Sequence, residues 1–144
     1  RAQWKKPLVL ISGRYALANP ASGNSNEKSE LVVKLRNYDP ARAEHLLESQ
    51  RSGMSSMVEL VNRLSASFPS VEFVYRPHPF ERLETYYDLL DMKRNSNLHL
   101  SKQGTIHGWL ALADAVIHRG CTTAIEAGML GVAALSPKWV ATPE

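Results

Sequence analysis

The stretch from Ala115 to Leu135, AVIHRGCTTAIEAGMLGVAAL, decides the fold class of this chain. It opens with a short apolar, β-branched run that stops at Gly120, and it closes with a second such run over residues 132–135. Short, nearly continuous apolar runs are typical of strands that are buried on both faces of a parallel sheet. The residues from Thr123 onward read as the start of a helix. The stretch therefore predicts a strand, a glycine turn, a helix and a second strand.

The same strand pattern occurs three more times upstream, at residues 7–12, 71–76 and, more weakly, 97–100. Helical spacing of apolar residues predicts helices over 41–51, from Met57 after Gly53, over 80–90 and over 105–113. Strands that alternate with helices of about ten residues imply right-handed crossovers and parallel pairing. We therefore predict an α/β fold, a Rossmann-like doubly wound parallel sheet of about five strands, with helices on both faces. The expected strand order is 3-2-1-4-5 or a close variant.

Residues 13–30 follow the first predicted strand and are rich in turn-forming residues, without helical or strand periodicity. They predict a long mobile loop, in which Asn19 to Asn26 are poorly ordered. Unstructured loops of this length are usually functional or disordered. Because this one leaves the carboxyl end of a strand, it lies where ligands bind in such sheets.

Composition limits the classes of protein and of partner. The 144 residues suit one domain, here residues 1–144, and the net charge is +3. A lone Cys121 and the absence of HxxxH or CxxC spacing exclude a disulfide scaffold and a zinc finger, and we expect no metal and no cofactor. No apolar run is long enough to span a bilayer. Lys and Arg are scattered, which favours a small anionic ligand or an anionic membrane surface over nucleic acid.

The first candidate site is Arg76-Pro77-His78-Pro79, at the carboxyl end of a predicted central strand. Proline on both sides of His78 restricts the backbone and holds the imidazole on a stiff support. That is what a ligand-orienting side chain requires. The alternative is that the prolines only end the strand and that His78 is an ordinary loop residue.

The second candidate site runs from His118 to Ala127, where a strand passes through Gly120 into the start of a helix. The free N–H groups and the dipole of a helix start favour phosphate. The hydroxyls of Thr122 and Thr123 could donate to phosphate oxygens, and Glu126 could accept from a ribose diol. The alternative is a capping box, in which Thr123 and Glu126 only satisfy backbone N–H groups of the first turn.

These two motifs resemble those of GT-B glycosyltransferases. The strand, the glycine turn, the paired hydroxyls and the Glu126-Ala127 pair are similar to the donor-binding motif, and Arg76 to Pro79 resembles the His-Pro motif of bacterial capsule and lipopolysaccharide transferases. The closest resemblance is to surface carbohydrate biosynthesis proteins, and it covers residues 71–135 well. The chain departs from the pattern at Ala133, where proline is usual, and it lacks an acceptor-binding amino-terminal domain.

The resemblance implies a carboxyl-terminal, nucleotide-sugar-binding half of a larger two-domain protein, with an unknown catalytic residue. Its implied partners are a nucleotide-activated sugar, a glycan or lipid-linked acceptor, the missing amino-terminal domain and, peripherally, the inner membrane surface on the cytoplasmic side. Two alternatives are a nucleotide-sugar epimerase or hydrolase of the same fold and a non-catalytic binding domain. The predicted nucleotide-sugar-binding residues are Arg76, His78, His118, Arg119, Gly120, Thr122, Thr123 and Glu126.

Overall fold

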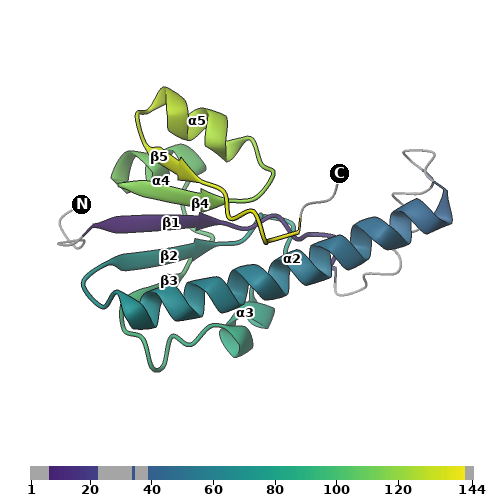
Figure 1. Ribbon diagram of the computed structural model, residues 1–144, viewed down its shortest axis with the longest axis horizontal. Coiled ribbons are helices and arrows are strands. Elements are labelled where there is room, and N and C mark those ends of the chain that lie inside the picture. Colours follow the sequence, from purple (N-terminus) through teal and green to yellow (C-terminus); the bar gives the residue numbers. More distant parts are fainter. Residues whose placement is uncertain (1–6, 23–33, 35–38, 142–144) are drawn as a thin grey trace.

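The structure, a computed structural model, describes residues 7–22, 34 and 39–141. In these ranges five parallel strands form one sheet in the order β3-β2-β1-β4-β5 (Figure 1). The strands are β1 (Leu8–Ser12), β2 (Glu72–Arg76), β3 (Leu98–Leu100), β4 (Ala115–His118) and β5 (Ala133–Leu135). The predicted α/β class, the parallel pairing and the strand order are confirmed.

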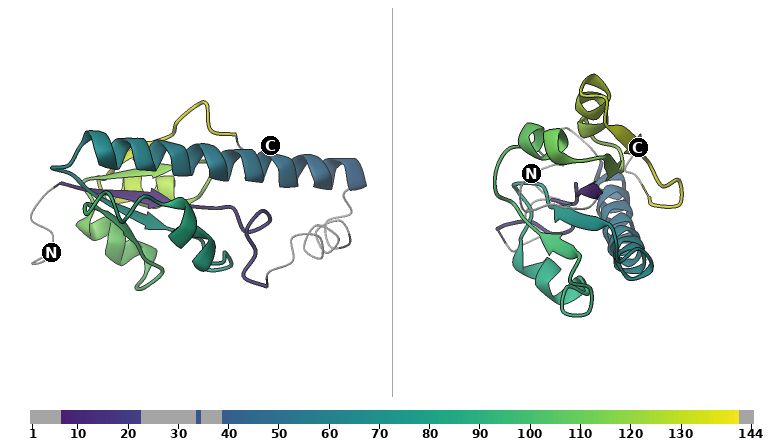
Figure 2. Two further views of the ribbon diagram at one scale, coloured as in Figure 1. Left: turned by 90° about the horizontal axis from the view of Figure 1, so that it is seen from below. Right: turned by 90° about the vertical axis from the view of Figure 1, so that its left-hand side faces the viewer.

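The helices of the described ranges cover both faces of the sheet, which gives a Rossmann-like arrangement. Figure 2 shows the long α2 on one face and α4 on the other. None of these helices combines the length and the apolar character needed to cross a membrane. The helices are α2 (Pro40–Ser67), α3 (Glu84–Leu89), α4 (Ile106–Leu112) and α5 (Thr123–Met129).

Two apolar cores, one on each face, hold the layers together. Alternate residues of a strand point to opposite faces, so Ile11 of β1 packs into the core beneath α2 while Leu10 packs beneath α4. Both side chains are fully buried. The central strand is thus apolar from Leu8 to Ile11 and ends at the polar Ser12.

The helix α2 is one continuous element, although the sequence predicts two helices separated at Gly53. It begins at Pro40 and is capped by Asp39, whose carboxylate accepts a hydrogen bond from Arg42 N at 2.9 Å. Gly53 is buried, and a Cβ there would lie 2.7 Å from the carbonyl oxygen of Ala141. The glycine therefore allows another segment to approach the helix, and it does not end the helix.

The described part of the predicted mobile loop, residues 13–22, is packed. Asn19 is buried, and its side chain donates to Arg82 O and accepts from Thr85 Oγ1, both at 2.8 Å. The prediction that Asn19 is poorly ordered is therefore wrong. Residues 23–30 of the loop lie outside the described ranges. Because Asn19 and its neighbours pair with residues 80–82, α3 begins only at Glu84 and not at Phe80 as predicted.

Candidate functional site

A pocket of about 290 Å³ lies at the carboxyl ends of β1, β2 and β4. The chain runs from β1 outward to β2 and β3 on one side and then returns to β4 on the other, so the strand order reverses beside β1. Such a reversal leaves a crevice, and ligands of open α/β sheets bind there. The pocket is lined by Ser12, Gly13, Arg76, Pro77, His78, Pro79, Ile106, Thr122, Thr123 and Glu126.

The structure brings together five of the eight predicted site residues. Both candidate motifs contribute to the same pocket, so the expectation that His78 and Thr122 face one cleft is confirmed. This follows from parallel pairing, because loops that leave the carboxyl ends of neighbouring strands meet at one edge of the sheet. The five residues are Arg76, His78, Thr122, Thr123 and Glu126.

His78 is fixed through both its backbone and its ring. Its backbone N–H donates to Glu81 Oε1 at 2.8 Å, and its Nδ1 accepts from Phe80 N at 3.2 Å. A ring nitrogen that accepts a hydrogen bond carries no proton, which assigns the proton of the neutral ring to Nε2. His78 thereby has an N–H donor even without a positive charge, and such a donor suits an anionic oxygen.

Arg76 holds its guanidinium against the loop that follows β3. Nη1 donates to Gln103 O and Nη2 donates to Gly104 O, each at 2.7 Å. Partial burial lowers the pKa of Arg76, but a guanidinium stays protonated in proteins. The pocket wall therefore carries a positive charge in a fixed position.

The capping box predicted as the alternative for Thr123 and Glu126 does not form. The residue before α5 is Thr122, and its side chain makes no capping hydrogen bond. Thr123 is buried, and its Oγ1 lies 3.3 Å from Ser12 Oγ of β1, within hydrogen-bond distance. The two threonines therefore differ: Thr123 joins the sheet to α5, while Thr122 is exposed at the pocket.

The carboxylate of Glu126 lies beside His107, the second residue of α4, and the two form an ion pair only when the histidine is protonated. His107 Nε2 lies 3.3 Å from Glu126 Oε2, and the histidine side chain is 70% exposed. Oε2 is shielded from solvent and has no hydrogen-bond partner among the described residues. Sequence reasoning gave His107 only a structural or surface role, and the fold places it beside a pocket carboxylate.

The remaining predicted residues, His118, Arg119 and Gly120, lie outside the pocket lining. Arg119 is turned toward the segment after β5, where it donates to Val140 O and Ser136 Oγ. Gly120 has a φ of +64°, which favours glycine, and its carbonyl oxygen accepts from Arg14. Burial lowers the pKa of His118, and the nearby Arg119 charge lowers it further.

Sequence reasoning missed Ser12, Gly13 and Ile106 in the lining and Glu81 behind it. Ser12 and Gly13 end the first predicted strand. Because ligands bind at the carboxyl ends of such strands, the sequence could have indicated both residues. Glu81 had no such signal, because it falls in the first turn of the helix predicted over 80–90, where a glutamate is usually exposed. It is instead fully buried.

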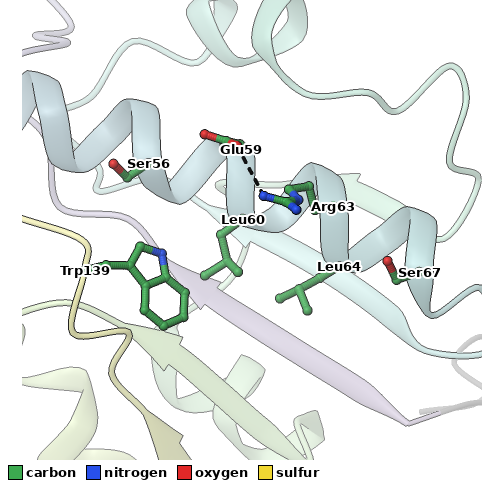
Figure 3. Close-up of a pocket in the computed structure, with 7 residues that line it drawn as sticks. All are labelled: Ser56, Glu59, Leu60, Arg63, Leu64, Ser67 and Trp139. Atoms are coloured by element: carbon green, nitrogen blue, oxygen red, sulfur yellow. Dashed lines mark hydrogen bonds and ion pairs between the residues drawn. The ribbon is translucent and has the colours of Figure 1, made fainter.

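A second, larger hollow of about 410 Å³ lies between α2 and the segment after β5 (Figure 3). Trp139 and the α2 residues Leu60 and Leu64 point toward it, and an ion pair joins Glu59 to Arg63 at 3.5 Å. None of the predicted site residues lines this hollow.

The described residues hold no group of three or more His, Cys, Asp or Glu side chains arranged to bind a metal ion. A scan against models of known protein families and a search of curated proteins found no match to this chain.

Proposed function

We propose that this chain is the donor-nucleotide-binding part of a glycosyltransferase of bacterial surface polysaccharide assembly. In this proposal the pocket takes the phosphate and ribose groups of a nucleotide-activated sugar. The observation that carries the proposal is the meeting of the two motifs, which contribute His78 and Thr122 to one pocket at the reversal of strand order.

The chemistry of the lining suits a phosphate. The hydroxyl of Thr122 and the Nε2–H of His78 are hydrogen-bond donors, and Arg76 adds a fixed positive charge. Donors held in place before the reaction stabilise the charge that develops on a leaving phosphate. Glu126 is the acceptor that a ribose diol requires. The sugar and the acceptor would lie on the open side, toward the amino-terminal domain that the resemblance implies.

The pocket volume is consistent with part of a nucleotide sugar and not the whole. Small-molecule pockets are usually about 300 to 1,000 Å³, so 290 Å³ is at the lower end. The same proposal places the protein in the cytoplasm, peripheral to the inner membrane, because nucleotide sugars are made in the cytoplasm.

The test is calorimetric titration with uridine, cytidine and guanosine mono- and diphosphates, followed by two pocket variants. Thr122→Val removes one exposed hydroxyl, and Glu126→Gln replaces a carboxylate by a neutral amide. Each should weaken binding of the best nucleotide by about 1 to 2 kcal/mol, because charge-assisted hydrogen bonds are the stronger ones. Thermal denaturation should show little change in stability for either variant, since the capping box is absent.

The matched control is Glu59→Gln, the same change at the exposed α2 carboxylate that lines the other hollow. It should leave nucleotide affinity unchanged. If none of the nucleotides binds the wild-type chain, the non-catalytic alternative replaces this proposal. If a nucleotide binds with unchanged affinity in Glu126→Gln, the ribose role of Glu126 is wrong.

A further inference from the structure

A fully buried carboxylate, Glu81, lies behind the wall of the pocket and does not line it. It belongs to the loop that connects β2 to α3. Its Oε1 accepts the backbone N–H of His78 at 2.8 Å, and the same oxygen lies close to Gly13, at the start of the loop after β1. One side chain therefore holds the loop after β2 and lies against the loop after β1, and both loops begin at the pocket.

The second carboxylate oxygen faces the apolar core beneath α2. Oε2 accepts a hydrogen bond from the hydroxyl of Tyr86, which in turn accepts one from Tyr75 at 3.3 Å. Both tyrosines are fully buried, with ring centroids 4.6 Å apart. The two oxygens thus have different partners: Oε1 contacts the pocket loop, and Oε2 contacts the core.

The loop that contains Glu81 is also joined to the loop after β3. Lys102 Nζ donates to the backbone carbonyl oxygens of Glu81 and, at 3.2 Å, of Pro79. On the other side, Gly13 approaches so closely that a Cβ would lie 3.4 Å from Glu81 Oε1. The loops after β1, β2 and β3 therefore converge on this residue.

Burial of a carboxylate is costly for folding, and an apolar residue of similar volume is often at least as stable. Burial raises the pKa of Glu81, although its hydrogen bonds oppose the shift. Stability therefore does not explain why a carboxylate is buried at this position. The contact to His78 N supplies one, because that hydrogen bond sets the backbone that carries a pocket imidazole.

We infer that Glu81 is a positioning residue of the pocket, which acts through Oε1 on the backbone of His78. The identity of the ligand in this inference rests on the proposed function. The position of the His78 ring then depends on an acceptor at Oε1 and not on the bond between Oε2 and Tyr86.

The experiment compares four variants of the whole chain. Glu81→Met removes both acceptors at similar volume, and Glu81→Gln restores one carbonyl acceptor. Tyr86→Phe removes the donor on the core side only. Asn97→Leu is the matched control: Asn97 is also buried and donates three hydrogen bonds, but it lies at the start of β3, on the edge of the sheet away from the pocket.

Two readouts are measured for each variant. The first is calorimetric affinity for the best of the uridine, cytidine and guanosine phosphates. The second is hydrogen exchange of the backbone amide of His78, which needs no ligand. Glu81→Met should weaken binding about tenfold or more and should speed exchange at His78, since a partly buried N–H loses its acceptor.

Glu81→Gln should retain affinity within about threefold, because its carbonyl oxygen accepts the same N–H. Tyr86→Phe and Asn97→Leu should lower stability to urea while affinity and His78 exchange stay at wild-type values. If Glu81→Met does not fold, Glu81→Asp replaces it. Asp keeps the charge but is one methylene too short to reach His78, so the same loss of affinity is expected.

Wild-type affinity and wild-type His78 exchange in Glu81→Met, or in its replacement Glu81→Asp, would overturn the inference. So would an affinity loss that follows stability equally in all four variants, because that pattern shows a purely structural residue. If the wild-type chain binds none of the nucleotides, the proposed function fails, and His78 exchange alone decides the role of Glu81.

Discussion

Arg119 joins two parts of the chain that follow different strands. It comes directly after β4, and its guanidinium donates to Val140 O, Lys138 O and Ser136 Oγ in the segment after β5. The planar guanidinium has several N–H donors in fixed directions, so one side chain can satisfy several acceptors. This contact holds the segment that approaches Gly53 of α2.

We expect Arg119→Lys to lower the free energy of unfolding by about 1 to 2 kcal/mol, because one ammonium cannot replace the set of guanidinium hydrogen bonds. Nucleotide affinity should not change, since Arg119 does not line the pocket. Urea unfolding and calorimetric titration measure the two quantities. A weaker affinity at unchanged stability would instead return Arg119 to the binding site, as the sequence predicted.

The site residues show which kinds of information the sequence lacks. The hydroxyl of Thr123 is bonded to a side chain 111 positions away, so local spacing suggested a capping box that does not form. Glu81 is buried by loops that meet only after the sheet is formed. Residues at strand ends, such as Arg76 and His78, were predictable because the strand itself places them.

At the scale of elements, α2 differs most from its prediction. With 28 residues it is about 42 Å long, far longer than the five-residue strands beneath it. Its amino-terminal part extends beyond the sheet (Figure 1). A glycine usually weakens a helix, and for that reason the sequence favoured a break at Gly53. The close approach of Ala141 is a tertiary contact and leaves no local pattern.

Gly53→Ala should therefore destabilise the protein in spite of the higher helix propensity of alanine. The added Cβ would meet the Ala141 carbonyl oxygen at 2.7 Å, and relief of such overlap typically costs on the order of 1 to 3 kcal/mol. The control is Gly128→Ala in α5, where no atom lies within 4 Å of the added Cβ. That change should raise stability by about 0.5 to 1 kcal/mol. Urea unfolding measures the change in stability of both variants. Equal changes would contradict the close contact between Gly53 and Ala141.

The strands were the best-predicted elements because their signal is a continuous apolar run. β1 and β4 are buried on both faces, so their sequences show the pattern clearly. β5 was also predicted, yet all three of its residues are exposed. Its apolar run marks an exposed strand at the edge of the described sheet.

At the scale of the whole molecule, several exposed apolar side chains belong to the elements at this edge or to the segments beside them. They come from α5, β5 and the segments that follow each of them. An edge strand presents unpaired backbone N–H and C=O groups to another chain, and exposed apolar side chains beside it favour such pairing. The residues are Ile125 (67% exposed), Met129 (83%), Leu130 (51%), Leu135 (53%) and Trp139 (70%).

We expect Leu135→Lys to reduce self-association of the chain, because a charge on an edge strand opposes intermolecular pairing. Its free energy of unfolding should change by no more than about 0.5 kcal/mol, since Leu135 is exposed. Sedimentation velocity over a range of protein concentrations measures the association. Identical concentration dependence in the wild type and the variant would show that this edge is not a contact surface.

The hydrogen-bond contact between Ser12 and Thr123 also sets a time at which the pocket can first exist. These residues are 111 positions apart, and pairings over such separations form late because closure of a long loop costs entropy. A chain leaves the ribosome with its amino terminus first. β1 is therefore made long before β4 and can pair with it only after β4 has emerged. A nascent chain therefore cannot hold a ligand in this pocket until α5 has left the ribosome, when most of the described residues have already been made.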